Sequence, residues 1–99
     1  MEVRVLSWAL LMENYSMIIF TKHALEKFKI LKQHDCYVTK EQILKTIANP
    51  EKIDYSRKPL LIAQSKFDTN HVLRVVYKKE KDLIKIITFY PGRKKQYEK

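Results

Sequence analysis

Residues 71–90 read HVLRVVYKKEKDLIKIITFY and hold two runs rich in β-branched and aromatic residues. The runs at 71–79 and 83–90 predict two strands, and the charged KEKD at 79–82 predicts the turn of a hairpin between them. Strands joined by so short a connection usually pair antiparallel, so we expect this hairpin to form the middle of an antiparallel sheet.

Three further runs extend the predicted sheet. KIDYS at 52–56 and PLLIAQSKF at 59–67 stand directly before the hairpin and have a similar composition. MIIFT at 17–21 reads as a short buried strand. The sheet is therefore expected to contain four to five strands.

Two helical patterns separate the first of these strands from the others. Apolar residues recur at helical spacing over 22–34, and Thr21 stands where it can cap the first turn. Thr39 and Gln42 have the spacing of a capping box, and the helix that follows stops at 49–50, Asn-Pro. The order predicts an α+β fold of two layers, with two helices packed on one face of an antiparallel sheet.

The composition indicates one small domain with a strong positive charge. Ninety-nine residues, 45% of them hydrophobic, suffice for one core but not for two independent domains. Twenty Lys and Arg against eleven Asp and Glu give a formal net charge of +9, which favours RNA, DNA or acidic protein as partners. Cys36 is the only cysteine, and no apolar run approaches the ~20 residues of a membrane span. We expect a cytoplasmic protein without a membrane partner.

Residues 1–16 differ from the rest of the chain. They contain one cation and two acids, whereas residues 17–99 carry nineteen cations against nine acids. Met17 stands immediately before the first predicted strand. Two interpretations are open: translation starts at Met17, or residues 1–16 are an extra strand or helix that covers a surface or mediates self-association. In both, residues 17–99 form the single domain.

Arg74 lies inside an otherwise apolar predicted strand and must have a partner, because an unpaired buried charge costs several kcal/mol. One interpretation is an ion pair with an acid of the chain. The other is that the guanidinium crosses the open face of the sheet and binds a phosphate through two hydrogen bonds.

The end of the chain reads PGRKKQYEK, and Pro91-Gly92 is expected to end the last strand. Cations interleaved with an aromatic residue suit single-stranded nucleic acid, since rings stack on bases while cations meet phosphates. The predicted nucleic-acid contacts here are Tyr90, Arg93, Lys94, Lys95 and Tyr97. The alternative is a solvated basic tail.

The sequence gives no sign of a metal or cofactor site. His23 and His34 are eleven residues apart, about 16 Å along a helix, so they cannot share an ion. Gly92 is the only glycine, which excludes the glycine-rich loops that bind nucleotides. His23 is either a general acid or base near neutral pH or a structural hydrogen-bonding residue.

The stretches FTKHALEKF, LLIAQSKF, LRVVY and IKIITFYP, with a second helix ending in ANP, resemble the RelE/ParE-like toxin superfamily. The resemblance covers about residues 17–97 and is greatest to BrnT-type toxins and the uncharacterised small families beside them. It implies a RelE-like two-layer fold and the toxin of a type II toxin–antitoxin pair. The implied activity is a metal-independent endoribonuclease that cleaves mRNA, often on the ribosome, by attack of the ribose 2′-OH on the neighbouring phosphate.

The resemblance also implies roles for particular residues. Arg74 occupies the place of a sheet arginine that binds phosphate, and Arg93 and Tyr97 match the basic and aromatic positions near the C-terminus. Further positions expected to contact RNA are Lys22, Lys27 and Lys78. The C-terminal segment lacks a histidine, so proton transfer falls to Tyr97 or His23, and the cations around a tyrosine would have to lower its pKa.

The implied partners are an acidic antitoxin, RNA and the ribosome, in a homodimer or a toxin–antitoxin hetero-oligomer. Some relatives poison DNA gyrase instead of cutting RNA. Two other interpretations stay open: a non-catalytic basic module that binds nucleic acid or protein, and an inactive relative kept for its interaction with a partner.

Overall fold

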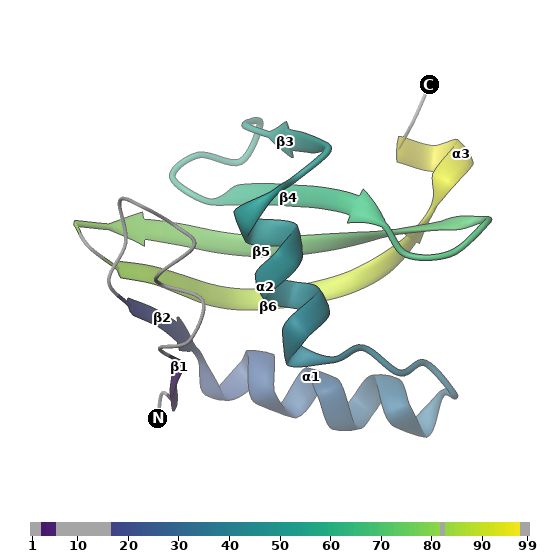
Figure 1. The fold of residues 1–99 in the computed structure, drawn as a ribbon, viewed down its shortest axis with the longest axis horizontal. Helices are drawn as coiled ribbons and strands as arrows, with labels where there is room; N and C mark the ends of the chain where they lie inside the picture. Colours follow the sequence, from purple (N-terminus) through teal and green to yellow (C-terminus); the bar gives the residue numbers. More distant parts are fainter. Residues whose placement is uncertain (1–2, 6–16, 82, 98–99) are drawn as a thin grey trace.

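The computed structural model describes residues 3–5, 17–81 and 83–97, which form six strands and three helices (Figure 1). In chain order these elements are β1 (Val3–Val5), β2 (Met17–Phe20), α1 (Lys22–Gln33), α2 (Lys40–Ala48), β3 (Lys52–Asp54), β4 (Leu61–Lys66), β5 (His71–Glu80), β6 (Leu83–Arg93) and α3 (Lys94–Tyr97). The predicted α+β class is confirmed, and so is each strand and helix that the sequence predicted.

The strands form one mixed sheet in the order β1-β2-β6-β5-β4-β3. All neighbours are antiparallel except β2 and β6, which are parallel. The expectation of a purely antiparallel sheet of four to five strands is therefore wrong. Short turns force antiparallel pairing only on strands that follow one another closely, whereas two helices and three strands separate β2 from β6.

The extra strand is β1, which pairs antiparallel with β2. This pairing is the outcome expected if the N-terminal segment adds a strand to the domain, at least over residues 3–5. The predictions made for residues 6–16 lie outside the described residues.

β6 is longer than predicted, because it continues through Pro91 and Gly92 to Arg93. β2 pairs only with residues 83–86 of β6, so within the described residues the second half of β6 has β5 as its strand partner. A proline is tolerated where no neighbouring strand needs its missing N–H. Pro91 and Gly92 therefore do not end the strand, and α3 begins only after Arg93.

Both long helices begin at the predicted caps. The Thr21 hydroxyl accepts the Ala24 N–H at 3.2 Å and donates to the Ile87 carbonyl of β6 at 3.1 Å. Thr39 and Gln42 form the capping box, with bonds of 2.8 and 3.1 Å. Because the Thr21 hydroxyl bonds both elements, it fixes the start of α1 against the sheet.

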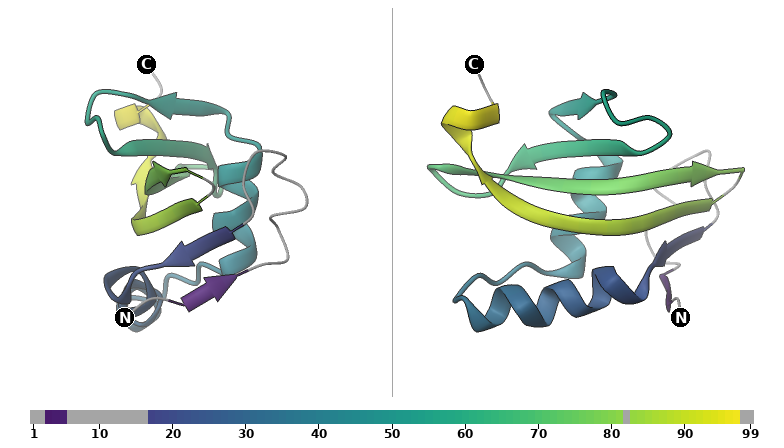
Figure 2. Two further views of the ribbon diagram at one scale, coloured as in Figure 1. Left: turned by 90° about the vertical axis from the view of Figure 1, so that its left-hand side faces the viewer. Right: turned by 180° about the vertical axis from the view of Figure 1, so that it is seen from behind.

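The core lies between the sheet and the helices α1 and α2 (Figures 1 and 2). Alternate residues of β5 and β6 pack against the buried faces of the helices; the fully buried members include Leu73, Val75, Ile84, Ile86 and Phe89. Seen from behind in Figure 2, β5 and β6 have no helix in front of them. This open face carries Arg74.

The chain has the dimensions of one folded unit. The Cα radius of gyration is 12.9 Å, close to the ~13 Å expected for a compact domain of about 100 residues. Over the residues that the structure describes, none of the helices is long and apolar enough to cross a membrane.

Candidate nucleic-acid interface

Arg74 sits on the open face and is only 4% exposed. Its Nε donates to the Tyr90 hydroxyl at 3.2 Å, and Nη1 donates to Gln64 Oε1 at 2.6 Å. Nη2 donates to Asp54 Oδ2 at 3.0 Å, which makes an ion pair. The ring of Tyr97 covers the guanidinium, with 4.1 Å between Cζ and the ring centroid. We call these five side chains the arginine cluster.

The pairing of the strands assembles this cluster. The antiparallel register places Gln64 and Tyr90 directly opposite Arg74 on its two neighbouring strands. Side chains opposite one another project from the same face, so three polar groups meet in one cross-strand row. Asp54 reaches the row from β3 at the edge of the sheet.

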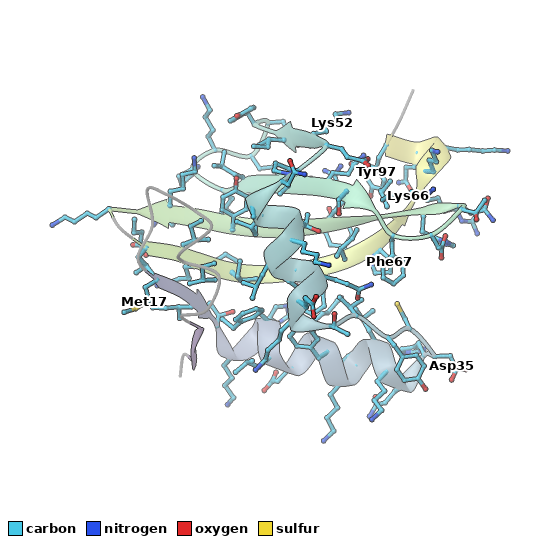
Figure 3. The ribbon with its side chains drawn as sticks, viewed as in Figure 1. Met17, Asp35, Lys52, Lys66, Phe67 and Tyr97 are labelled. Atoms are coloured by element: carbon cyan, nitrogen blue, oxygen red, sulfur yellow. The ribbon has the colours of Figure 1, made fainter. Side chains whose placement is uncertain are left out.

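Tyr97 is held over Arg74 by the one glycine of the chain. A Cβ added at Gly92 would lie 2.3 Å from Cε2 of Tyr97, far inside a normal contact. The φ of Gly92 is not positive, so the close approach of the ring is what requires glycine here. Lys52 Nζ also donates to the Tyr97 carbonyl at 3.1 Å, and Figure 3 shows these two residues at the same corner of the molecule.

Asp54 is ionised in this environment. Hydrogen bonds from the Ser56 side chain and backbone N–H, and then from Arg74, lower the pKa of Asp54 to about 2. The carboxylate therefore stays charged over the physiological pH range and balances the positive charge of the Arg74 guanidinium.

These contacts decide between the two interpretations of Arg74. Of the two, the structure shows the ion pair, with a carboxylate, an amide and a phenol already bonded to the guanidinium. An anion reaches this guanidinium only if a covering group moves. Arg74 is therefore not an open phosphate clamp in this structure.

Three cations gather where β6 ends and α3 begins. Arg93, Lys94 and Lys95 line one hollow of about 650 Å³. The other lining residues are Thr69 and Asn70 of the turn between β4 and β5, and His71, the first residue of β5. The Lys94 N–H donates to the Asn70 carbonyl at 2.8 Å, which ties α3 to this turn. We call Arg93, Lys94 and Lys95 the basic end of the sheet.

Sequence reasoning missed a second pair of polar groups at this end. His71 Nδ1 lies 2.9 and 3.1 Å from the two carboxylate oxygens of Asp68. The Asp68 carboxylate also accepts the Asn70 N–H at 2.8 Å. The only signal in the sequence is an aspartate three residues before a histidine in a predicted turn, a spacing that many turns share.

The structure brings some of the predicted site residues together. Arg74, Tyr90 and Tyr97 belong to the arginine cluster on the open face. Arg93, Lys94 and Lys95 lie at the adjacent end of the sheet, where α3 folds back and places Tyr97 on Gly92. Residues 94–97, for which a solvated basic tail was one of the two interpretations, form a short helix with exposed Lys94 and Lys95 and with Tyr97 packed on Gly92.

His23 is not part of this group. It lies in the first turn of α1, whose cap bonds β6 at Ile86 and Ile87. Gly92, under the Tyr97 ring, is five or six residues further along β6, about 17–20 Å at ~3.3 Å per residue. In Figure 3, Met17, which begins the strand leading into α1, lies on the opposite side from Tyr97.

The remaining predicted RNA contacts lie on other parts of the fold than the basic end. Lys22 and Lys27 belong to α1, as His23 does. Lys78 stands in the half of β5 nearer the β5–β6 turn, 4.0 Å from Glu80. Within the described part of the chain, no group of three or more His, Cys, Asp or Glu is arranged to hold a metal ion.

Comparisons of this chain with models of known protein families, with curated proteins and with solved structures gave no match.

Proposed function

We propose that this chain is the toxin of a type II toxin–antitoxin pair, of the RelE/ParE-like class, and that it cleaves RNA without a metal ion. The observation that carries the proposal is the basic end of the sheet. Arg93, Lys94 and Lys95 share one hollow, and α3, which begins at Lys94, also places Tyr97 over Arg74. Clustered cations beside an aromatic ring are what single-stranded RNA requires.

Each group has a role in the proposed reaction. The 2′-OH attacks the neighbouring phosphorus, negative charge grows on the phosphoryl oxygens, and the cations of the basic end stabilise that charge. The Tyr97 phenol is the candidate proton-transfer group of the open face. Arg74 acts as a positioning residue, since its guanidinium supports the Tyr97 ring. His23 lies too far from this site to act on the same phosphate.

The test is cleavage of a single-stranded RNA by the purified chain in EDTA, with and without ribosomes. We expect cleavage in at least one of the two conditions. Tyr97→Phe keeps the ring over Arg74 and removes only the hydroxyl, so a loss of cleavage without a loss of stability would assign proton transfer to the phenol. Intact RNA in both conditions contradicts the proposal.

The antitoxin is expected to be a small acidic protein, because the chain carries a net charge of +9. Expression of the chain alone should arrest growth, and Arg93→Gln with Lys95→Gln should relieve the arrest. Equal toxicity of this variant and the parent would place the site elsewhere.

A second candidate function is a non-catalytic module that binds nucleic acid. The observation in its favour is that Arg74 is already held by Asp54 and Gln64, which leaves the arginine cluster closed. This function predicts RNA binding without any product. Each phosphate contact contributes a slope of about −0.7 in log K against log salt for single strands. The variant with both Arg93→Gln and Lys95→Gln loses two contacts, so the magnitude of its slope should be smaller by about 1.4.

A further inference from the structure

We propose that His71, oriented by Asp68, is the general base of the RNA cleavage, acting on a phosphodiester held at the basic end of the sheet. The inference rests on the proposed function and adds to it a residue on β5 that no sequence pattern singled out.

The turn between β4 and β5 holds the carboxylate in place. The N–H groups of Phe67 and Asp68 both donate to the His71 carbonyl, at 3.0 and 3.1 Å. The Asp68 side chain in turn accepts the Asn70 N–H at 2.8 Å and faces His71 Nδ1 at 2.9 Å. Four hydrogen bonds among residues 67–71 therefore fix the position of Asp68 relative to His71.

This geometry determines which ring nitrogen is reactive. Because Nδ1 faces a carboxylate, it carries the proton of the neutral imidazole and Nε2 keeps the lone pair. The hydrogen bond from His71, followed by the backbone bond from Asn70, lowers the pKa of Asp68, so the carboxylate is charged at neutral pH. The His71 side chain is 42% exposed and can be reached by a large substrate.

Three observations place the cations beside this histidine. His71 and Arg93 are direct cross-strand partners on β5 and β6. The bond from the Lys94 N–H to the Asn70 carbonyl fixes the start of α3 on the same turn. His71 and the three cations line one hollow, whose volume of about 650 Å³ falls within the range of small-ligand sites.

The proposed step balances in atoms and charge. Nε2 of His71 takes the proton of the ribose 2′-OH while the 2′-oxygen forms its bond to phosphorus and the bond from phosphorus to the 5′-oxygen breaks. The departing 5′-oxygen takes a proton from the Tyr97 phenol, and solvent returns a proton to the phenolate and accepts the one held by His71. The products are a 2′,3′-cyclic phosphate and a 5′-hydroxyl. Imidazole is the side chain that most often acts as a general base in enzymes.

Other charged or titratable groups face His71 from every neighbouring element. They come from the loop after α1, the β4–β5 turn, the end of β6 and α3: Asp35, Cys36, Tyr37, Asp68, Arg93, Lys94 and Lys95. Of these, Asp68 is the group bonded to the ring. Its replacement in Asp68→Asn should lower kcat and leave the KM for RNA unchanged, because the ring loses the carboxylate that fixes its orientation.

The experiment compares the full-length parent, His71→Asn, His71→Gln and His34→Asn on one RNA in EDTA. Asn at 71 retains an amide N–H in place of Nδ1–H, and Gln places an amide near the position of Nε2. We expect both His71 variants to lose about 10²–10⁴-fold in rate. RNA affinity and thermal unfolding should stay at parent values. His34→Asn, at the exposed end of α1, should cleave as the parent does.

The possible outcomes distinguish a failure of the role proposed for His71 from a failure of the proposed ribonuclease function. Cleavage at parent rate by both His71 variants, or an unchanged kcat in Asp68→Asn, overturns the role of the Asp68–His71 pair and leaves the ribonuclease function standing. Absence of cleavage by the parent overturns both.

Discussion

Gly92 and Tyr97 show how one residue without a side chain can shape a surface. The ring of Tyr97 occupies the space where a Cβ of residue 92 would lie, and from there it covers Arg74. The tyrosine, the glycine and the arginine therefore act as one packed unit, although they come from α3, β6 and β5.

Gly92→Ala should disrupt this unit. The methyl group forces the ring off the sheet, so we expect the free energy of unfolding to fall by about 1–2 kcal/mol through overpacking and loss of the cation–π contact. Urea unfolding measures the change. In a Tyr97→Ala background the same substitution should cost much less, and an equal cost in both backgrounds would contradict the packing described.

Arg74→Met should be among the most destabilising substitutions in the chain. It removes the guanidinium that donates to buried Gln64 and to the Asp54 carboxylate, and a hydrogen bond from a charged group contributes about 1.5–3 kcal/mol. Because the two residues are in contact, adding Asp54→Asn to Arg74→Met should restore part of the loss in a double-mutant cycle. Strict additivity of the two changes would show that the ion pair contributes nothing.

The pH dependence of stability should report Asp54. Its pKa is lowered from 3.8 to about 2 in the folded chain, so its stabilisation is complete above about pH 4 and is lost as the pH falls toward 2. Unfolding free energies over pH 2–5 should show a deficit in Asp54→Asn that is largest above pH 4 and shrinks below it. A deficit independent of pH would mean that the carboxylate is not tuned by its neighbours.

Sequence reasoning at this scale recognised that Arg74 needs a partner but could not name it. The partners are 10 to 23 positions away in the chain, and the pairing of β3, β4, β5 and β6 together with the position of α3 brings them together. The same limit applies to His71, whose proposed role depends on the Arg93 opposite it.

At the scale of elements, short stretches of sequence were enough to predict the features that depend only on neighbouring residues, such as helix caps. Thr21 and the Thr39–Gln42 box marked both long helices, since a cap depends on residues three positions apart. The parallel pairing of β2 with β6 and the extension of β6 past Pro91 depend on which strands become neighbours. No window of sequence contains that information.

Thr39→Ala tests the capping box. The side chain of Thr39 accepts the Gln42 N–H, and losing it should lower the free energy of unfolding by about 1 kcal/mol. Thr39→Ser keeps the acceptor and serves as the matched control in the same denaturant titration. If alanine and serine variants unfold alike, the box does not stabilise α2.

At the scale of the whole molecule, the open face of the sheet and the end of the sheet beside α3 carry different chemical groups. The open face carries the arginine cluster, whose charge is neutralised internally by Asp54. The end of the sheet carries Arg93, Lys94 and Lys95 beside the Asp68–His71 pair. The net charge predicted a polyanionic partner, but only the fold shows at which end of the sheet these groups meet.

The most direct measurement is the chemistry of the RNA ends produced by the purified chain in EDTA. An RNA cut by its own 2′-OH should yield a 2′,3′-cyclic phosphate and a 5′-hydroxyl, and a single 2′-deoxy substitution at the cut site should abolish that cut. An RNA that stays intact, or one that is cut equally well with the 2′-deoxy substitution, would contradict the proposed function.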